Sequence, residues 1–464
     1  MSQKKTTMSS TITPNKSLDE SSASLESHDL SYLVSPGGEL TGSFRVPGDK
    51  SISHRSIMLG SLAEGTTTIE GFLEGEDSLA TLSAFKSMGV NIEGPEQGRI
   101  TIQGVGLQGL KPSKEPLYLG NSGTSMRLLC GLLAAQNFTS VLTGDSSLSS
   151  RPMQRVADPL KKMGADISLQ EGGLAPITIK PAGLKPIHFE MKVASAQVKS
   201  CLILASLYVD GTTTIVEPAP CRDHTERMLK GFGYPLDVEG NTVHVHGGGA
   251  LKGGHIDIPA DISSAAFFMV GASIAEGSDV VLEHVGINPT RTGVINILKL
   301  MGANITISNE KEVGGELVAD IRIQYAQLQG IEIPVDQVPL AIDEFPVLFV
   351  AAACAKGKTV LSGAEELKVK ESDRIQVMAD GLEKLGVDLK VTNDGIEIKG
   401  GGFNSAEDVT IDSHGDHRIA MSFVIAGLKA ASQITILDCN NVATSFPGFV
   451  EFAQNMGSGV KASR

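Results

Sequence analysis

The stretch Leu62-Ala63-Glu64-Gly65-Thr66-Thr67-Thr68-Ile69 returns later in the chain as Tyr208-Val209-Asp210-Gly211-Thr212-Thr213-Thr214-Ile215. In both copies a short apolar segment reaches a glycine, and a run of β-branched residues follows. Glycine is favoured just past the end of a helix, and threonine and isoleucine are favoured in strands. The stretch therefore predicts a helix that passes directly into a strand. The helix end recurs at Ala275-Glu276-Gly277 and Ala355-Lys356-Gly357.

A second kind of helix end occurs six times, each time as a large apolar residue followed by glycine. The six pairs are Met88-Gly89, Met163-Gly164, Phe232-Gly233, Met301-Gly302, Leu385-Gly386 and Met456-Gly457. They are spaced by roughly 70 to 85 residues, and self-similarity at a nearly fixed period indicates one supersecondary unit used repeatedly. We predict six units, each of which reads helix, strand, helix, strand, strand.

The first helix of each unit is apolar on nearly all sides, as over residues 128–135 and 265–272. A helix without a polar face is either buried or membrane-spanning, and about a dozen residues is too short to cross a bilayer. The second helices, such as the one that ends over 380–386, are amphipathic. We therefore expect the first helices to pack inside each lobe, with the sheets and the second helices around them.

The chain of 464 residues is long enough to need at least two domains, because single cores stop growing at about 250 to 300 residues. Two similar junctions, Val46-Pro47-Gly48-Asp49 and Ile258-Pro259-Ala260-Asp261, divide the six units into three and three. We expect the chain to cross between lobes at both, with ordinary Pro/Gly turns as the alternative. The predicted lobes are residues 49–259, and residues 31–48 together with 260–464.

Residues 1–30 contain many Ser, Thr and Lys and few large apolar residues, which is typical of a disordered tail. A transit peptide is the alternative, and the lack of arginine in this stretch disfavours it. The five cysteines form no Cys-x-x-Cys pair. They indicate reduced thiols and a cytoplasmic protein.

The formal net charge of −14 and an aromatic content of 4% without tryptophan disfavour a nucleic-acid surface, which needs a basic footprint. Seven cations nevertheless recur near helix starts, and these are Lys50, Arg55, Arg151, Arg222, Lys370, Arg374 and Arg418. The inner helices also begin with capping residues, and a helix N-terminus carries about half a positive charge. If the units are related by rotation, these N-termini point to a common mouth.

Such a mouth predicts a cleft for a polyanionic substrate, although any single cation could instead be a solvated surface charge. No Gly-x-x-x-x-Gly-Lys-Ser/Thr motif occurs, so the phosphates are not those of a nucleotide held by such a loop. Two carboxylates, Asp343 and Glu371, stand among the cations, and crowded charges have the perturbed pKa values that suit proton transfer. For Asp343, at the start of an inner helix, a cap is the alternative.

Three histidines lie in or beside these segments. His414 and His417 have no third partner at a recognisable ligand spacing, so we predict no metal site. His54 is expected to be a buried, hydrogen-bonded histidine rather than a base.

Five motifs in order give the chain a family resemblance over about residues 33–457. They are 47–55 (Pro-Gly-Asp-Lys-Ser-Ile-Ser-His-Arg), 119–124 (Leu-Gly-Asn-Ser-Gly-Thr), Arg151-Pro152, 370–374 (Lys-Glu-Ser-Asp-Arg) and 416–418 (Asp-His-Arg). With these motifs the chain resembles the 5-enolpyruvylshikimate-3-phosphate (EPSP) synthases. One motif alone would be weak, but five in register are highly specific.

The resemblance implies an α/β fold, a two-lobed inside-out α/β barrel built from six βαβαββ repeats, three per lobe. It implies transfer of the enolpyruvyl group of phosphoenolpyruvate to the 5-hydroxyl of shikimate 3-phosphate through a tetrahedral intermediate, with release of phosphate. Glyphosate is expected to compete with phosphoenolpyruvate. No cofactor is implied, and we expect a monomer whose partners are these two small molecules.

The resemblance also implies roles for individual residues. Asp343 would receive the 5-hydroxyl proton, while Glu371 and Lys370 would manage protonation of the methylene carbon and departure of phosphate, with Lys50 as a further catalytic group. Shikimate 3-phosphate would be held by Lys50, Ser51, Arg55, Ser195, Ala196, Gln197, Arg222, Asp343 and Lys370. Phosphoenolpyruvate would be held by Lys50, Asn121, Gly123, Arg151, Gln197, Arg374 and Arg418.

Two departures from the family pattern stand out. Ala196 replaces a serine of many members, which removes one hydroxyl contact to the substrate phosphate, and Thr444 stands where many members place a lysine. The pattern resembles a divergent bacterial branch. UDP-N-acetylglucosamine enolpyruvyl transferases are the rival, but they generally use a cysteine on a loop equivalent to 142–151, which has none here. A non-catalytic anion-binding module is the third alternative.

Overall fold

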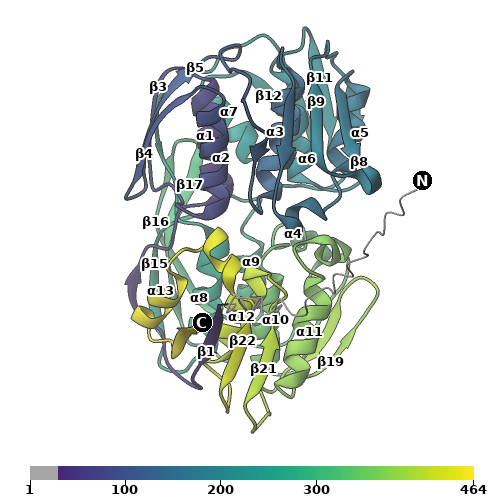
Figure 1. Ribbon diagram of the computed structural model, residues 1–464. Coiled ribbons are helices and arrows are strands. Elements are labelled where there is room, and N and C mark those ends of the chain that lie inside the picture. Colours follow the sequence, from purple (N-terminus) through teal and green to yellow (C-terminus); the bar gives the residue numbers. More distant parts are fainter. Residues whose placement is uncertain (1–29) are drawn as a thin grey trace, which may run out of the picture.

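The computed structural model describes residues 30–464 and consists of two lobes, one above the other in Figure 1. The tail predicted over residues 1–30 lies outside the described residues except for Leu30. Each lobe has its own hydrophobic core. The core of the first lobe is drawn from residues between Ile52 and Ile258, and that of the second from residues between Tyr32 and Val46 and between Ala260 and Val460.

The first lobe contains three repeats of one unit. They comprise α1 (Lys50–Leu62), β3 (Glu64–Glu70), α2 (Glu76–Ser87), β4 (Asn91–Glu96) and β5 (Arg99–Val105); β6 (Leu117–Tyr118), α3 (Gly123–Ala134), β7 (Ser140–Thr143), α4 (Ser146–Ser149), α5 (Gln154–Lys162), β8 (Asp166–Gln170) and β9 (Leu174–Lys180); and β10 (His188–Glu190), α6 (Ala196–Ser206), β11 (Thr212–Val216), α7 (His224–Gly231), β12 (Leu236–Glu239) and β13 (Thr242–His246).

The second lobe repeats the unit three more times. Its elements are α8 (Ile262–Ile274), β15 (Asp279–Gly286), α9 (Gly293–Leu300), β16 (Asn304–Val313) and β17 (Glu316–Gln324); α10 (Phe345–Cys354), β18 (Lys358–Leu361), α11 (Arg374–Lys384), β19 (Asp388–Val391) and β20 (Ile396–Lys399); and β21 (Val409–Asp412), α12 (His417–Ala426), β22 (Ile434–Leu437), α13 (Phe449–Met456) and β23 (Val460–Ser463). The predicted order of helices and strands is confirmed.

Three short strands join sheets that are distant in sequence. β2 (Thr41–Phe44) precedes the first repeat but pairs in parallel with β15 of the second lobe. β14 (His255–Asp257) precedes the fourth repeat but pairs in parallel with β3 of the first lobe. β1 (Ser31–Val34) lies between β22 and β23 and is antiparallel to both. Near the start of the chain and near its middle, the polypeptide thus supplies a strand to one lobe before entering the other.

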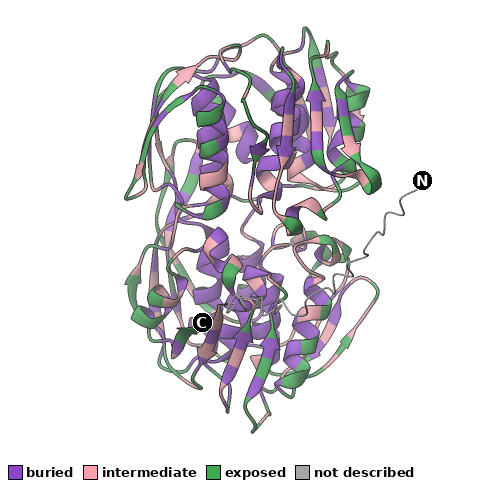
Figure 2. Cartoon of the chain, in the orientation of Figure 1, coloured by how far each residue is buried: buried purple, intermediate pink, exposed green. Residues whose placement is uncertain are grey.

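The first helix of each repeat is buried inside its lobe, as predicted (Figure 2). All of α8 is buried, and α3 approaches α6 so closely that a Cβ added to Gly131 would lie 1.9 Å from the carbonyl oxygen of Cys201. Within residues 30–464, no helix combines the length and apolar character needed to cross a bilayer. The structural relatives reported below share this inside-out α/β barrel, with helices inside and sheets outside.

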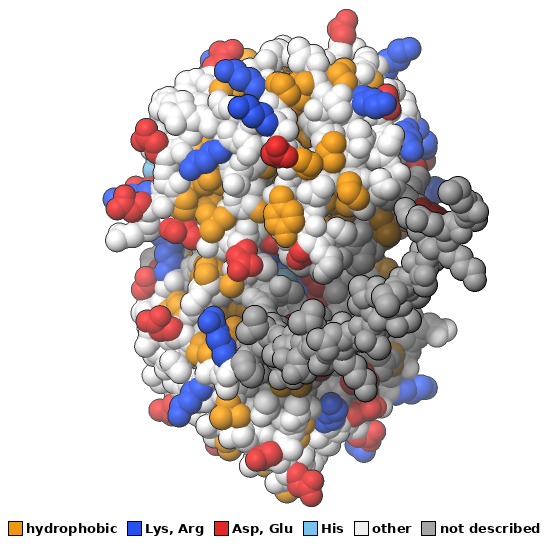
Figure 3. All heavy atoms as spheres, viewed as in Figure 1, with side chains coloured by type: hydrophobic (Ala, Val, Ile, Leu, Met, Phe, Trp, Pro, Cys, Tyr) orange, Lys and Arg blue, Asp and Glu red, His pale blue; other side chains and the backbone are white. Residues whose placement is uncertain are grey.

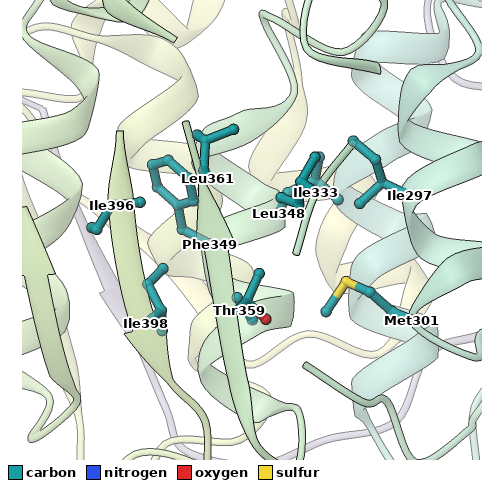
Figure 4. A pocket seen from close by; sticks show the side chains of 10 residues that line it. Ile297, Met301, Ile333, Leu348, Phe349, Thr359, Leu361, Ile396 and Ile398 are labelled. Atoms are coloured by element: carbon teal, nitrogen blue, oxygen red, sulfur yellow. The ribbon is translucent and has the colours of Figure 1, made fainter. Parts of the chain in front are cut away.

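A small cavity lies in the core of the second lobe, between α9, α10 and the paired strands β18 and β20 (Figure 4). Its volume is about 10 Å³, and the side chains around it are almost all apolar, such as Met301, Phe349 and Ile398. A space of this size holds one water at most. The cavity therefore reflects imperfect core packing and offers no room for a substrate.

The two crossing segments lie against each other between the lobes. The backbone N–H of Asp49 donates to Pro259 O (2.8 Å), and that of Asp261 donates to Pro47 O (2.9 Å). The buried Arg291 pairs with both aspartates, at 3.1 Å from Asp49 and 3.2 Å from Asp261. Because Asp49 caps α1 and Asp261 caps α8, one guanidinium holds the first inner helix of each lobe.

We expect Arg291→Met to lower the free energy of unfolding by about 3–5 kcal/mol, because it leaves two adjacent buried carboxylates without a cation. Urea denaturation measures the loss. Arg291→Met combined with Asp261→Asn should lose less than Arg291→Met alone, since one buried charge then remains instead of two. An equal loss in both proteins would contradict this explanation.

Candidate active site

The N-termini of the inner helices are capped as the sequence predicted, with one exception. Ser122 accepts from Ser125 N at 3.1 Å on α3, Ser195 caps α6, and Asp416 accepts from Arg418 N at 2.9 Å on α12. The capping alternative for Asp343 is wrong, because the N-cap position of α10 is Glu344 and no side chain caps it. The Asp343 carboxylate pairs with cations instead.

These cations belong to a group of charged residues between the lobes, which we call the interlobe cluster. One of its residues comes from the first lobe and the others come from the second. Its members are Arg222 from the first lobe and Asp343, Lys370, Glu371, Arg374, Asp416 and Arg418 from the second. Asp343 pairs with Arg222 across the lobes, and its other oxygen lies 3.3 Å from Lys370 Nζ and 3.2 Å from Arg374 Nη1.

The surroundings of Asp343 hold it ionised. Burial acts to raise the pKa of this carboxyl, but four neighbouring cations, with Lys370 the strongest, outweigh burial and hold the pKa well below its usual range. An ionised carboxylate is ready to accept a proton. Asp343 therefore has the protonation state that a general base needs.

Arg374 is the hub of the cluster, and only 1% of its side chain is exposed. It donates to Glu371, to Asp343, and through Nε to Asp416 at 2.9 Å. Burial acts to raise the pKa of Glu371, but nearby positive groups, Arg374 foremost, hold it well below its usual range. Arg374 thus holds two carboxylates beside each other in ionised form.

The first motif places Lys50, Ser51 and Arg55 on the first two turns of α1. Lys50 Nζ lies 2.5 Å from Asp77 of α2. Arg55 is buried and its guanidinium donates to Thr225 Oγ1 (2.7 Å) and to the carbonyl of Ser51 (2.9 Å). Arg55 therefore ties α1 to α7, an internal role that the sequence did not show.

The second motif forms a compact group at the start of α3. Arg151 Nη2 donates to Asn121 Oδ1 at 2.5 Å, and Asn121 Nδ2 donates to Asp145 at 2.8 Å. Gly123 is the first residue of α3, and a Cβ there would lie 3.4 Å from Arg151 Nη1. The sequence suggested that Arg151 lies near the start of a helix. In the structure it lies in the turn between α4 and α5.

The third group sits at the start of α6 and includes a cation that sequence reasoning missed. Arg127 Nη1 donates to Gln197 Oε1 at 2.7 Å, and Gln197 Nε2 donates to Thr124 at 3.1 Å. Ala196 begins the helix directly after the cap Ser195. Arg127 follows Gly123 by four residues and therefore lies on the same helix face. That spacing is the signal that could have found it.

Arg418 joins the cluster through the backbone just before α10, with Nη1 at 3.0 Å from Asp343 O and 3.8 Å from the carboxylate of the buried Glu344. His54 is buried and lies 2.8 Å from Thr81 Oγ1, as predicted. In the part of the chain that the structure describes, no three His, Cys, Asp or Glu side chains gather as metal ligands would.

Two contacts at the rim join the lobes. Arg155 of α5 pairs with Glu366 of the second lobe at 2.9 Å. A Cβ on Gly75 would lie 2.7 Å from the carbonyl oxygen of Thr444, so the loop before α2 touches the segment in which Thr444 replaces the family's lysine. Figure 3 shows acidic and basic side chains interspersed on the outer face that it draws. The cations that gather at one place, Arg222, Lys370, Arg374 and Arg418, lie in the interlobe cluster.

A family model, EPSP synthase (3-phosphoshikimate 1-carboxyvinyltransferase), matches residues 34–452. The chain belongs to the EPSP synthase family. It is 63% identical to a 3-phosphoshikimate 1-carboxyvinyltransferase of Methylococcus capsulatus over 94% of this chain and 99% of the relative, and 63% identical to one of Alkalilimnicola ehrlichii over 92% and 96%.

Two solved structures are similar to this chain in fold. The EPSP synthase of Acinetobacter baumannii is 57% identical, with a TM-score of 0.85 over 94% of this chain and 100% of that chain. The enolpyruvyl transferase NikO of Streptomyces tendae shares the fold at 16% identity, with a TM-score of 0.76 over 94% and 99%. The family membership favours transfer of the enolpyruvyl group to shikimate 3-phosphate over the two alternatives, which are transfer to UDP-N-acetylglucosamine and a non-catalytic anion-binding module.

Proposed function

We propose that this protein transfers the enolpyruvyl group of phosphoenolpyruvate to the 5-hydroxyl of shikimate 3-phosphate in the shikimate pathway, which leads to the aromatic amino acids. The observation that carries the proposal is the Asp343 carboxylate, which pairs with Arg222, Lys370 and Arg374 where the lobes meet. The test is release of inorganic phosphate that requires both substrates. Phosphate released with phosphoenolpyruvate alone, or no release at all, would overturn it.

In this proposal Asp343 accepts the proton of the 5-hydroxyl as its oxygen bonds to C2 of phosphoenolpyruvate. A proton is added to the methylene carbon at the same stage, giving a tetrahedral intermediate with a methyl group. Elimination then returns one methyl proton to the protein and breaks the bond between C2 and the phosphate oxygen, and the departing phosphate takes up the proton that Asp343 had accepted. Glu371 carries the carbon-bound proton, while Lys370 and Lys50 offset the charge of the departing phosphate.

Nearby positive groups, Arg374 foremost, hold the pKa of Glu371 well below its usual range, so this carboxylate must acquire a proton before it can donate one. The bound anions supply the reason. Negative charge placed beside Arg151 and Lys50 cancels part of the positive potential that depresses the pKa of Glu371. Binding of both substrates therefore prepares the acid.

The two substrates occupy different helix N-termini in this proposal. Shikimate 3-phosphate lies against α1 and α6, with Lys50, Ser51, Ser195, Ala196, Gln197 and Arg222 around it, and Arg55 supports this wall from inside. Phosphoenolpyruvate lies at α3 and α12, with Asn121, Gly123, Arg151 and Arg418, where forked arginine donors suit carboxylate and phosphate. Each nitrogen of the Arg374 guanidinium donates to a carboxylate, and its direct contact with phosphoenolpyruvate remains a prediction.

The protein is proposed to act as a monomer in the cytoplasm and without a cofactor. Its moving bodies would be residues 49–259 and residues 31–48 with 260–464, joined by the two crossing segments.

We expect both substrates together to reduce the radius of gyration in small-angle scattering. Closure brings Lys50 and Arg151 of the first lobe toward Lys370 and Arg418 of the second, and bound anions relieve the mutual repulsion of these four cations. Sodium sulfate at matched ionic strength is the control. Identical radii with and without the substrates would remove the closing motion from the mechanism.

We expect Gly123→Ala to raise the inhibition constant of glyphosate by a larger factor than the KM for phosphoenolpyruvate. The added methyl would lie 3.1 Å from Arg127 Nη1 and 3.4 Å from Arg151 Nη1, which narrows the space between two guanidinium groups. The longer anion loses more from this narrowing. Gly183→Ala is the matched control, because nothing lies within 4 Å of a Cβ there. Equal factors would show that Gly123 does not border the space in which the two ligands differ.

A further inference from the structure

Lys199 is a buried cation whose ammonium group contacts none of the side chains assigned to the substrates. It lies on the second turn of α6, and only 1% of its side chain is exposed. Its Nζ lies 2.6 Å from a carboxylate oxygen of Glu217 and 2.6 Å from one of Glu226. A charge buried this deeply cannot reach a ligand between the lobes.

The partners of Lys199 lie on both sides of Arg222. Glu217 follows β11 and starts the loop over 217–223, and Glu226 lies in the first turn of α7 just after that loop. Lys199 Nζ also approaches the carbonyl oxygen of Cys221, the residue before Arg222, at 3.4 Å. One ammonium group therefore holds the loop at its start, beside Arg222 and just beyond its end.

Further bonds hold the same loop in place. The Cys221 thiol donates to Glu217 at 2.6 Å, and Asn241 Nδ2 donates to the carbonyl of Glu217 at 2.7 Å. Pro218 and Pro220 restrict the backbone between these points, because each proline ring fixes φ. The loop thus has few ways to move once Lys199 is in place.

The position of Lys199 connects this loop to the start of α6. Its backbone N–H donates to Ser195 O at 3.0 Å, and Gln197 lies two residues before it. The next residue, Ser200, lies 2.7 Å from Thr225 Oγ1, so α6 is fastened to α7 at a second point. The N-terminus of α6 and Arg222 are two of the groups proposed to bind shikimate 3-phosphate. Contacts inside the first lobe therefore connect them.

We propose that Lys199 is a positioning residue for shikimate 3-phosphate, which fixes Arg222 relative to the N-terminus of α6. The inference rests on the substrate role proposed for Arg222. A lysine is required because its long stem spans from the helix to the loop and its ammonium group neutralises two carboxylates at once. An apolar residue of the same length would leave Glu217 and Glu226 buried without a cation.

The test is a double-mutant cycle between Lys199→Met and Arg222→Ala, read as the dissociation constant of shikimate 3-phosphate and the KM for phosphoenolpyruvate. We expect Lys199→Met to raise the dissociation constant about tenfold and the KM less than about twofold, with no further rise when Arg222 is already alanine. Lys199→Arg should restore most of the affinity. Ser206→Ala, at the far end of α6, is the control and should change neither constant.

Folding is monitored by circular dichroism, and Glu226→Gln gives a second route because it keeps Lys199 and one carboxylate. It should raise the same dissociation constant in the same Arg222-dependent way. If the increases in the dissociation constant caused by the change at Lys199 or Glu226 and by Arg222→Ala multiply in the double variants, the positioning role of Lys199 is overturned. The same holds if the dissociation constant of shikimate 3-phosphate and the KM for phosphoenolpyruvate rise by equal factors. In both cases the substrate role of Arg222 still stands. An unchanged dissociation constant in Arg222→Ala would overturn the role proposed for Arg222 and the inference with it.

Discussion

Asp343→Asn is expected to lower turnover by about 10² to 10⁴, the range that a positioned general base supplies. The same change should leave the dissociation constant of shikimate 3-phosphate unchanged or lower it. Asparagine removes one negative charge from among Lys370, Arg222 and Arg374, which makes the surroundings more attractive to an anion. Loss of turnover together with retained or tighter binding is the signature of a base.

Steady-state phosphate release and calorimetric titration measure the two quantities. Asp336→Asn is the matched control, because Asp336 is exposed in the segment before α10 and pairs with none of the cluster. If Asp343 were only a counter-ion for its neighbours, Asp343→Asn would lower the thermal stability. The molecules that remain folded would then have the same turnover number as the unmodified protein. That pattern would remove Asp343 from the chemistry.

Glu371→Gln is expected to lower turnover by a similar factor of about 10² to 10⁴ and to stop exchange at the methylene carbon. In heavy water, addition places a deuteron on that carbon, and elimination can then remove either isotope. Recovered phosphoenolpyruvate and product should therefore carry deuterium in the unmodified protein. Glutamine preserves the shape and one hydrogen-bond acceptor for Arg374 but cannot carry the proton.

Mass spectrometry of both compounds measures this exchange. Glu365→Gln serves as the control, because Glu365 lies exposed on the turn before the 370–374 motif. Deuterium incorporation at the unmodified rate in Glu371→Gln would show that another group protonates the carbon. The exchange also separates the two carboxylates, since Glu371 is proposed to act on carbon and Asp343 on oxygen.

The repeats and the buried helices could be predicted because they depend on local patterns. Glycines after helix ends and helices that are apolar on all sides keep their meaning in any tertiary context. Three residues singled out in the sequence, Asp343, Lys370 and Arg222, meet between the lobes, although only Lys370 belongs to one of the five motifs. Helix capping was predictable for the same local reason.

The failures concern choices that only the folded structure makes. Asp343 could have capped α10, but three cations from elsewhere in the chain compete for its carboxylate and prevail. The sequence also did not show that Arg55, expected at the substrate, donates to Thr225 and to the carbonyl of Ser51 inside the first lobe; its contact with the substrate stays a prediction. No local pattern distinguishes a cation that meets a ligand from one that meets buried carboxylates, which is why Lys199 and Arg291 went unnoticed.

The place of β1 sets the order in which the molecule can be completed during synthesis. β1 leaves the ribosome first among the described strands, yet Tyr32 pairs with Ile436 on one side and Ala462 on the other. At about 5–20 residues per second, the roughly 400 residues between them take about 20–80 s to make. By then the units of the first lobe, closed by β14, have long been available to fold. The earliest strand to appear is thus among the last to find its partners, and for that interval it is an unpaired edge that a chaperone or a second chain could occupy.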